Sequence, residues 1–187
     1  MPRLFVAAAL PDAAIAELVA LRPRPAPGIR PAEPDQMHLT LHYIGEADVE
    51  QTTAHLGAVV APAFRLVIEG VGRFPSAGGA VTLWAGVRET SELLGLHKAV
   101  ATALAAGGFR PEARRYTPHI TLARSGPETP VSWADDFLAR QAGFTLPAVP
   151  IREFGLHSST IVKDVPVYRL ERSFPLRPCE PGDIETS

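Results

Sequence analysis

Cysteine is nearly absent from this chain, whose 187 residues include only Cys179. A single thiol cannot close an intrachain disulfide, and it cannot supply the ligands of a cysteine zinc site. Long apolar runs are missing as well. The run from Leu4 to Leu10 stops at Pro11 and is short for a secretory signal, and no stretch approaches the roughly 18 apolar residues of a membrane span. We therefore expect a cytoplasmic protein with no membrane partner.

The chain also lacks an excess of charge of either sign. It has 18 lysines and arginines against 20 aspartates and glutamates, a formal net charge of −2. This balance excludes a protein that grips nucleic acid mainly by bulk cationic attraction. Any nucleic-acid substrate would have to be held by local contacts.

Apolar residues and turn formers are plentiful: 46% of the chain is hydrophobic, and 19 prolines and 15 glycines are scattered without a period. This composition is typical of a globular domain with many turns. Apolar patterns predict strands over 3–10, 37–44, 64–71, 81–87, 119–123, 144–156 and 167–174, and helices over 12–21, 49–60, 90–106 and 131–139. The mixed order and the short connections favour antiparallel pairing and predict an α+β fold.

One pattern occurs twice, as His38-Leu39-Thr40-Leu41 and His119-Ile120-Thr121-Leu122. Composition does not explain two copies, and their similar places, each in a strand before a helix, suggest an internally duplicated fold. Side chains alternate along a strand, so each copy presents an imidazole and a hydroxyl on one face and aliphatic groups on the other. A pseudo-two-fold axis between the halves would bring the two polar pairs together across a cleft.

Two imidazoles and two hydroxyls suit attack by water on a phosphorus centre. A neutral histidine takes a proton from the nucleophile, and a protonated one gives a proton to the leaving oxygen. The threonines donate hydrogen bonds to the non-bridging oxygens, so no metal or other cofactor is required. A metal site on His38, His42 and His119 is disfavoured because no nearby Asp or Glu completes its ligand set.

Further candidates lie near the motifs. By strand alternation His42 shares the face of His38, where it is either a substrate contact or a surface residue. Tyr43 and Phe74 are candidates to stack on a base, whereas Trp84 is expected in the core. His97, placed in a helix, is expected to be solvated.

The two motifs, the opening Arg3-Leu4-Phe5-Val6-Ala7, the segments 37–46 and 116–124 and the closing stretch to Leu176 resemble the two-histidine phosphoesterase superfamily. The nearest branch is the LigT-like RNA 2′,3′-cyclic phosphodiesterases, once called 2′-5′ RNA ligases. The resemblance implies one bilobal domain over 1–176, with two similar halves and the active site between them, and a tail over 177–187. The segment His157-Ser158-Ser159 is treated as a loop.

The resemblance also implies hydrolysis of a 2′,3′-cyclic phosphate to a 2′-phosphate, on RNA ends or small cyclic nucleotides, by a monomer. His38 would be the proton donor and His119 the proton acceptor. The substrate-binding residues would be Thr40, Thr121, Arg124, Tyr43 and His42. By alternation Arg124 lies on the opposite face from His119, so a cation there needs a bend in the strand. Two alternatives stay open: RNA ligation, the reverse reaction of the same site, and a non-catalytic nucleotide-binding module on the same scaffold.

Overall fold

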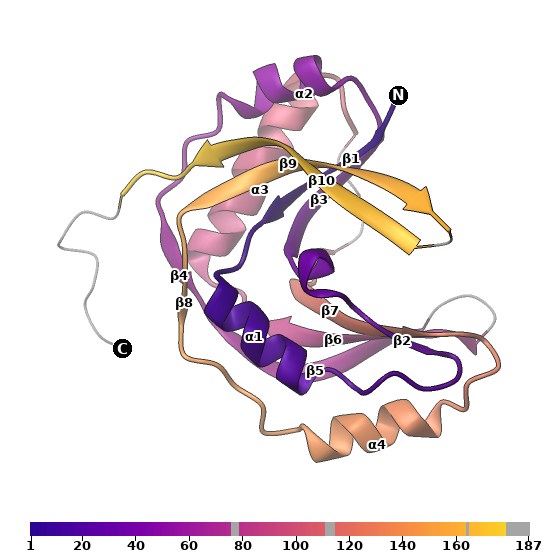
Figure 1. The fold of residues 1–187 in the computed structure, drawn as a ribbon. Helices are drawn as coiled ribbons and strands as arrows, with labels where there is room; N and C mark the ends of the chain where they lie inside the picture. Colours follow the sequence, from indigo (N-terminus) through magenta and orange to yellow (C-terminus); the bar gives the residue numbers. More distant parts are fainter. Residues whose placement is uncertain (76–78, 111–114, 164, 179–187) are drawn as a thin grey trace.

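Two four-stranded antiparallel sheets form the centre of the molecule, and each carries one of the repeated segments (Figure 1). The computed structural model describes residues 1–75, 79–110, 115–163 and 165–178. The first sheet has the order β10-β9-β1-β3 and the second β2-β7-β6-β5. The strands of the first are β1 (Arg3–Ala8), β3 (Leu39–Glu46), β9 (Glu153–Val162) and β10 (Val165–Pro175). Those of the second are β2 (Ile29–Pro31), β5 (Ile68–Pro75), β6 (Val81–Val87) and β7 (His119–Ser125).

Helices cover these sheets, which confirms the α+β prediction. They are α1 (Asp12–Leu21), α2 (Val49–Leu56), α3 (Ser91–Ala106), α4 (Ser132–Arg140) and the short 3-10 helix η1 (Pro34–Gln36). α3 packs on β3, α1 on β7 and α4 on β5, and Figure 1 shows α4 on the outer side of the second sheet. A small third sheet pairs β4 (Phe64–Leu66) with β8 (Val149–Ile151). The pseudo-two-fold relation between the halves stays a prediction.

The helix ends follow from local chemistry. The Asp48 side chain accepts a hydrogen bond from the Gln51 amide at 2.8 Å and caps α2. Thr90 accepts one from the Leu93 amide at 3.3 Å and caps α3, which ends before Gly108 at φ +80°. These caps confirm the predicted starts of both helices.

Strand boundaries depart from the predictions where distant partners decide them. The segment 22–36, for which no helix or strand is predicted, contains β2, which pairs with β7. The predicted strand over 64–71 is two strands, and that over 144–156 is replaced by β8 and β9. β9 continues through His157-Ser158-Ser159, because it is paired on both edges, with β1 and β10. The loop predicted at 157–159 is therefore wrong.

The aliphatic residues of both motifs anchor their strands in one core, as predicted. Leu39, Leu41, Ile120 and Leu122 are each no more than 2% exposed. The core ends near Arg177, whose backbone still exchanges hydrogen bonds with residues 61 and 63, so the described start of the predicted tail is attached to the body. Residues 179–187, including Cys179, lie outside the described residues. Within the described ranges, no helix is long and apolar enough to cross a membrane.

Candidate active site

One narrow cavity collects the polar side chains of both motifs. Its lining includes His38 and Thr40 from the first sheet, and His119 and Thr121 from the second. His38 lies immediately before β3, and His119 begins β7. The predicted meeting of two imidazoles and two hydroxyls is thus present in the fold.

The two strands share a register shift. The leucine after each threonine, Leu41 on β3 and Leu122 on β7, is skipped in the pairing with the neighbouring strand. One extra residue reverses the alternation, so the fifth residue after each histidine, not the fourth, points toward the cavity. Those residues are Tyr43 and Arg124, and both line it. This register shift therefore supplies the bend in the strand that brings Arg124 to the face of His119.

The same shift makes the predicted placement of His42 on the face of His38 wrong. His42 is 4% exposed. Its ring stacks on that of His97 at 4.0 Å between centroids, and its Nε2 lies 2.8 Å from the His97 carbonyl oxygen. The expectation of a solvated His97 is wrong too, because Tyr116 stacks on its ring at 3.9 Å. A substrate contact by His42 stays a prediction, since its side chain lines the cleft described next.

A cleft of about 280 Å³ opens from one side of the cavity, and its walls are largely aromatic. Tyr43 is 55% exposed at its edge. Phe74 meets the His119 ring edge-on at 4.8 Å and packs against Trp84 at 5.1 Å. Trp84, predicted in the core, is half-buried beneath Phe74 and fills the space over Gly72, where a side chain would clash with it. The Tyr116 hydroxyl donates to the Thr40 carbonyl at 3.0 Å and so ties the segment that leads into β7 to β3 at the cleft.

His38 sits among aromatic rings. Phe5 stacks on it at 5.0 Å and Tyr168 meets it edge-on at 5.2 Å. Burial, followed by the nearby His157 and Arg124, lowers the pKa of His38 to about 3, although a backbone hydrogen bond at Gln36 acts in the opposite direction. The His38 imidazole is therefore neutral at physiological pH when the cavity holds no anion.

His119 has a defined orientation. Its Nδ1 lies 2.7 Å from the Thr117 carbonyl oxygen. A carbonyl can only accept, so Nδ1 carries the hydrogen and the lone pair of the neutral ring is on Nε2. This is the tautomer that a proton acceptor at Nε2 requires.

Several lining or neighbouring residues were missed by sequence reasoning. Gln36 and Tyr168 line the cavity, and the His157 ring stacks on Phe5 at 5.2 Å. Tyr168 and His157 arrive through the strand order β10-β9-β1-β3, which joins the end of the chain to its beginning, and Gln36 comes from η1. Their spacing in the sequence carries no signal of this. Among the described residues, no group of three His, Cys, Asp or Glu is placed to hold a metal ion.

Known proteins are similar to this chain in sequence and in fold. A model of the 2′-5′ RNA ligase superfamily matches residues 10–160. A Thermus thermophilus protein named RNA 2′,3′-cyclic phosphodiesterase is 30% identical over 194 residues, which cover 94% of this chain and 90% of the relative. One of the same name from Archaeoglobus fulgidus is 29% identical over 150 residues, covering 79% of this chain and 84% of the relative.

Solved structures agree with these relatives. The crystal structure of the Thermus thermophilus protein TT0787 has a TM-score of 0.76 at 30% identity and covers 94% of this chain and 98% of that one. Escherichia coli LigT complexed with 3′-AMP has a TM-score of 0.69 at 25% identity, with the same two coverages.

Proposed function

Because this chain belongs to the 2′-5′ RNA ligase superfamily, we propose that it is an RNA 2′,3′-cyclic phosphodiesterase that works without a metal ion. The observation that carries the proposal is the single cavity lined by His38, Thr40, His119 and Thr121. The names of the relatives support the substrate.

The proposed reaction places the cyclic phosphate between the two motifs. The hydroxyls of Thr40 and Thr121 donate to its non-bridging oxygens, and Arg124 offsets their charge. His119 takes a proton from a water at Nε2 as the water oxygen bonds to phosphorus. The bond from phosphorus to O3′ breaks on the far side, and His38 gives O3′ a proton. The product keeps its phosphate on O2′.

The donor role of His38 requires a proton that burial of its ring disfavours. A phosphate anion about 4 Å away attracts an imidazolium by roughly 4 kcal/mol at an effective dielectric constant near 20, enough to return its pKa from about 3 toward neutrality. We propose that His38 gains its proton when the anionic substrate binds. In the free enzyme, burial together with the nearby His157 and Arg124 keeps His38 uncharged.

The aromatic cleft suits the base of the terminal nucleotide. Tyr43 and Phe74 present ring surfaces beside the cavity, and a volume of about 280 Å³ admits one base. Stacking is sequence-tolerant because every base has a π face. We therefore expect little discrimination among the four bases.

The test is hydrolysis of a nucleoside 2′,3′-cyclic phosphate in the presence of a chelator, with the 2′- and 3′-phosphate products separated. We expect turnover to the 2′-phosphate, lost in His119→Ala and kept in the matched control His55→Ala, whose imidazole is in α2 outside the cavity. Binding without turnover would instead identify a nucleotide-binding module. A requirement for Mn²⁺ or Zn²⁺, or a 3′-phosphate product, would contradict the proposed chemistry.

A further inference from the structure

A second groove, of about 500 Å³, opens from the phosphate cavity between β2 and the β9–β10 hairpin. It shares Gln36, Thr121, Arg124 and Tyr168 with the cavity, whereas the aromatic cleft shares Thr40, Tyr43 and His119. The cavity proposed to hold the phosphate is thus continuous with the aromatic cleft through one set of residues and with this second groove through another. Apolar residues line the groove, from both sheets and from the segment before β2: Pro25, Ile29, Pro31, Ile161, Val165 and Pro166.

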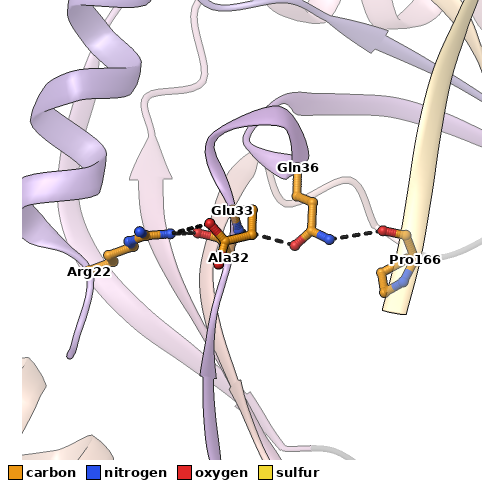
Figure 2. Close-up of polar contacts among 5 residues, drawn as sticks. All are labelled: Arg22, Ala32, Glu33, Gln36 and Pro166. Atoms are coloured by element: carbon orange, nitrogen blue, oxygen red, sulfur yellow. Dashed lines mark hydrogen bonds and ion pairs between the residues drawn. The ribbon is translucent and has the colours of Figure 1, made fainter. Parts of the chain in front are cut away.

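A chain of polar contacts holds this groove in shape (Figure 2). Gln36 donates from Nε2 to the Pro166 carbonyl at 2.9 Å, and its Oε1 accepts from the Glu33 amide at 3.2 Å. Arg22, at the end of α1, pairs with the Glu33 carboxylate at 3.5 Å and donates to the Ala32 carbonyl. Glu33, the carboxylate among the described lining residues, is therefore already paired with Arg22. The β10 strand and the β2–η1 segment are joined before any ligand binds.

Two arginines lie side by side in the groove. Arg30 on β2 is directly opposite Arg124 on β7 in the strand register, and both are exposed and line the groove. Directly opposite residues share a face of the sheet, with Cα atoms about 5 Å apart, and like charges there repel. No carboxylate within the described residues forms an ion pair with either guanidinium. An anion with charges spaced along a strand removes the repulsion.

We propose that Arg30 binds the phosphodiester that lies one nucleotide upstream of the cyclic phosphate, so that the enzyme prefers RNA ends to cyclic mononucleotides. The proposal rests on the function proposed above. In a nucleoside 2′,3′-cyclic phosphate the base leaves from C1′, beside C2′, while the chain continues from C4′, beside C3′. The base and the upstream phosphate therefore leave the ribose beyond opposite ends of the C2′–C3′ edge that carries the cyclic phosphate. With the base in the aromatic cleft, the chain enters the groove of Arg30.

The experiment compares kcat/KM on three substrates: adenosine 2′,3′-cyclic phosphate, the dinucleotide ApA with the same cyclic end, and that dinucleotide with a neutral methylphosphonate linkage. We expect the charged dinucleotide to be preferred over the mononucleotide by roughly tenfold, as for a charge-assisted hydrogen bond. The neutral linkage removes that preference. Added salt weakens it for the charged dinucleotide.

Two variants assign the preference. Arg30→Gln is expected to reduce the ratio of dinucleotide to mononucleotide kcat/KM to about that of the neutral substrate, while Arg30→Lys keeps part of it. The matched control Arg140→Gln makes the same charge change at the end of α4, away from the groove, and keeps the full ratio.

Wild-type hydrolysis of the mononucleotide separates the two proposals. If the wild type hydrolysed none of the three substrates, the proposed function would be overturned and this inference with it. Turnover of the mononucleotide with no preference for the charged dinucleotide, or with a preference unchanged in Arg30→Gln, would overturn this inference alone.

Discussion

The strands β3 and β7 carry the same motif with the same register shift, yet they give their histidines different surroundings. His38 is enclosed by Phe5 and Tyr168, and its pKa falls to about 3. His119 lies at the mouth of the aromatic cleft with its Nδ1 bonded to a carbonyl. A repeated backbone thus places two like groups, and the neighbouring strands make them chemically unlike.

The two strands also differ in the residue that follows the register shift and lines the cavity. The fifth position after the histidine is Tyr43 on β3 and Arg124 on β7. In the proposed complex, Tyr43 offers a ring to the base and Arg124 offers a cation to the phosphate. This asymmetry gives the proposed substrate a direction in the site, from base to phosphate to upstream chain.

The largest expected effect comes from removing either imidazole. His38→Ala and His119→Ala should each lower kcat by about 10²–10⁴-fold, because each removes one proton transfer from the transition state. The double variant should lose far less than the product of the two, since the histidines act as a unit. Steady-state rates of the three variants check this, with circular dichroism to confirm folding. Multiplicative losses would indicate two independent roles.

Thr40→Val and Thr121→Val should each cost roughly 1–3 kcal/mol of transition-state stabilisation, about 5–150-fold in kcat/KM. Valine keeps the shape of threonine and removes the hydroxyl donor. Similar losses in both variants would show that the two strands contact the phosphate equivalently. Unchanged turnover in one would show that its hydroxyl points elsewhere.

The pH profile separates the free and the bound enzyme. His38 must hold a proton in order to donate it, so the limb of the kcat/KM profile that reports His38 should lie near its free-enzyme pKa of about 3, well below 6.5. In the kcat profile that limb should move upward, since a bound phosphate anion favours the protonated imidazole. Limbs that coincide near 6.5 in both profiles would contradict the enclosed setting of His38.

A smaller effect concerns stability in acid. Burial lowers the pKa of His97 in α3 to about 4, against an ordinary value near 6.5. Between these values the unfolded chain binds more protons, so the free energy of unfolding falls as the pH falls from 6.5 to 4. His97→Phe keeps a ring between His42 and Tyr116 and should make the melting temperature less dependent on pH in this range. An unchanged slope would contradict the assignment.

The sequence predicted much of this arrangement. Side-chain alternation placed His38 with Thr40 and His119 with Thr121, and the caps at Asp48 and Thr90 are local signals. Alternation failed for His42 because a one-residue shift depends on pairing with β1, which no local pattern encodes.

The residues that enclose His38 were beyond local reasoning for a related reason. Tyr168 is on β10, and His157 on β9, which joins β10 to β1. They reach His38 through pairing between opposite ends of the chain. Neither strand repeats the His-x-Thr spacing, so only the three-dimensional order of the sheet brings them to the site.

The division of labour between the histidines is tested most directly by a substrate whose leaving group needs no protonation. A phosphodiester with a nitrophenolate leaving group is hydrolysed by the wild type, His38→Ala and His119→Ala under the same conditions. If His38 donates and His119 accepts, His38→Ala is largely rescued and His119→Ala stays slow. Rescue of His119→Ala alone would reverse the roles. Rescue of neither would contradict the account, because the histidines would then bind the phosphate without transferring protons.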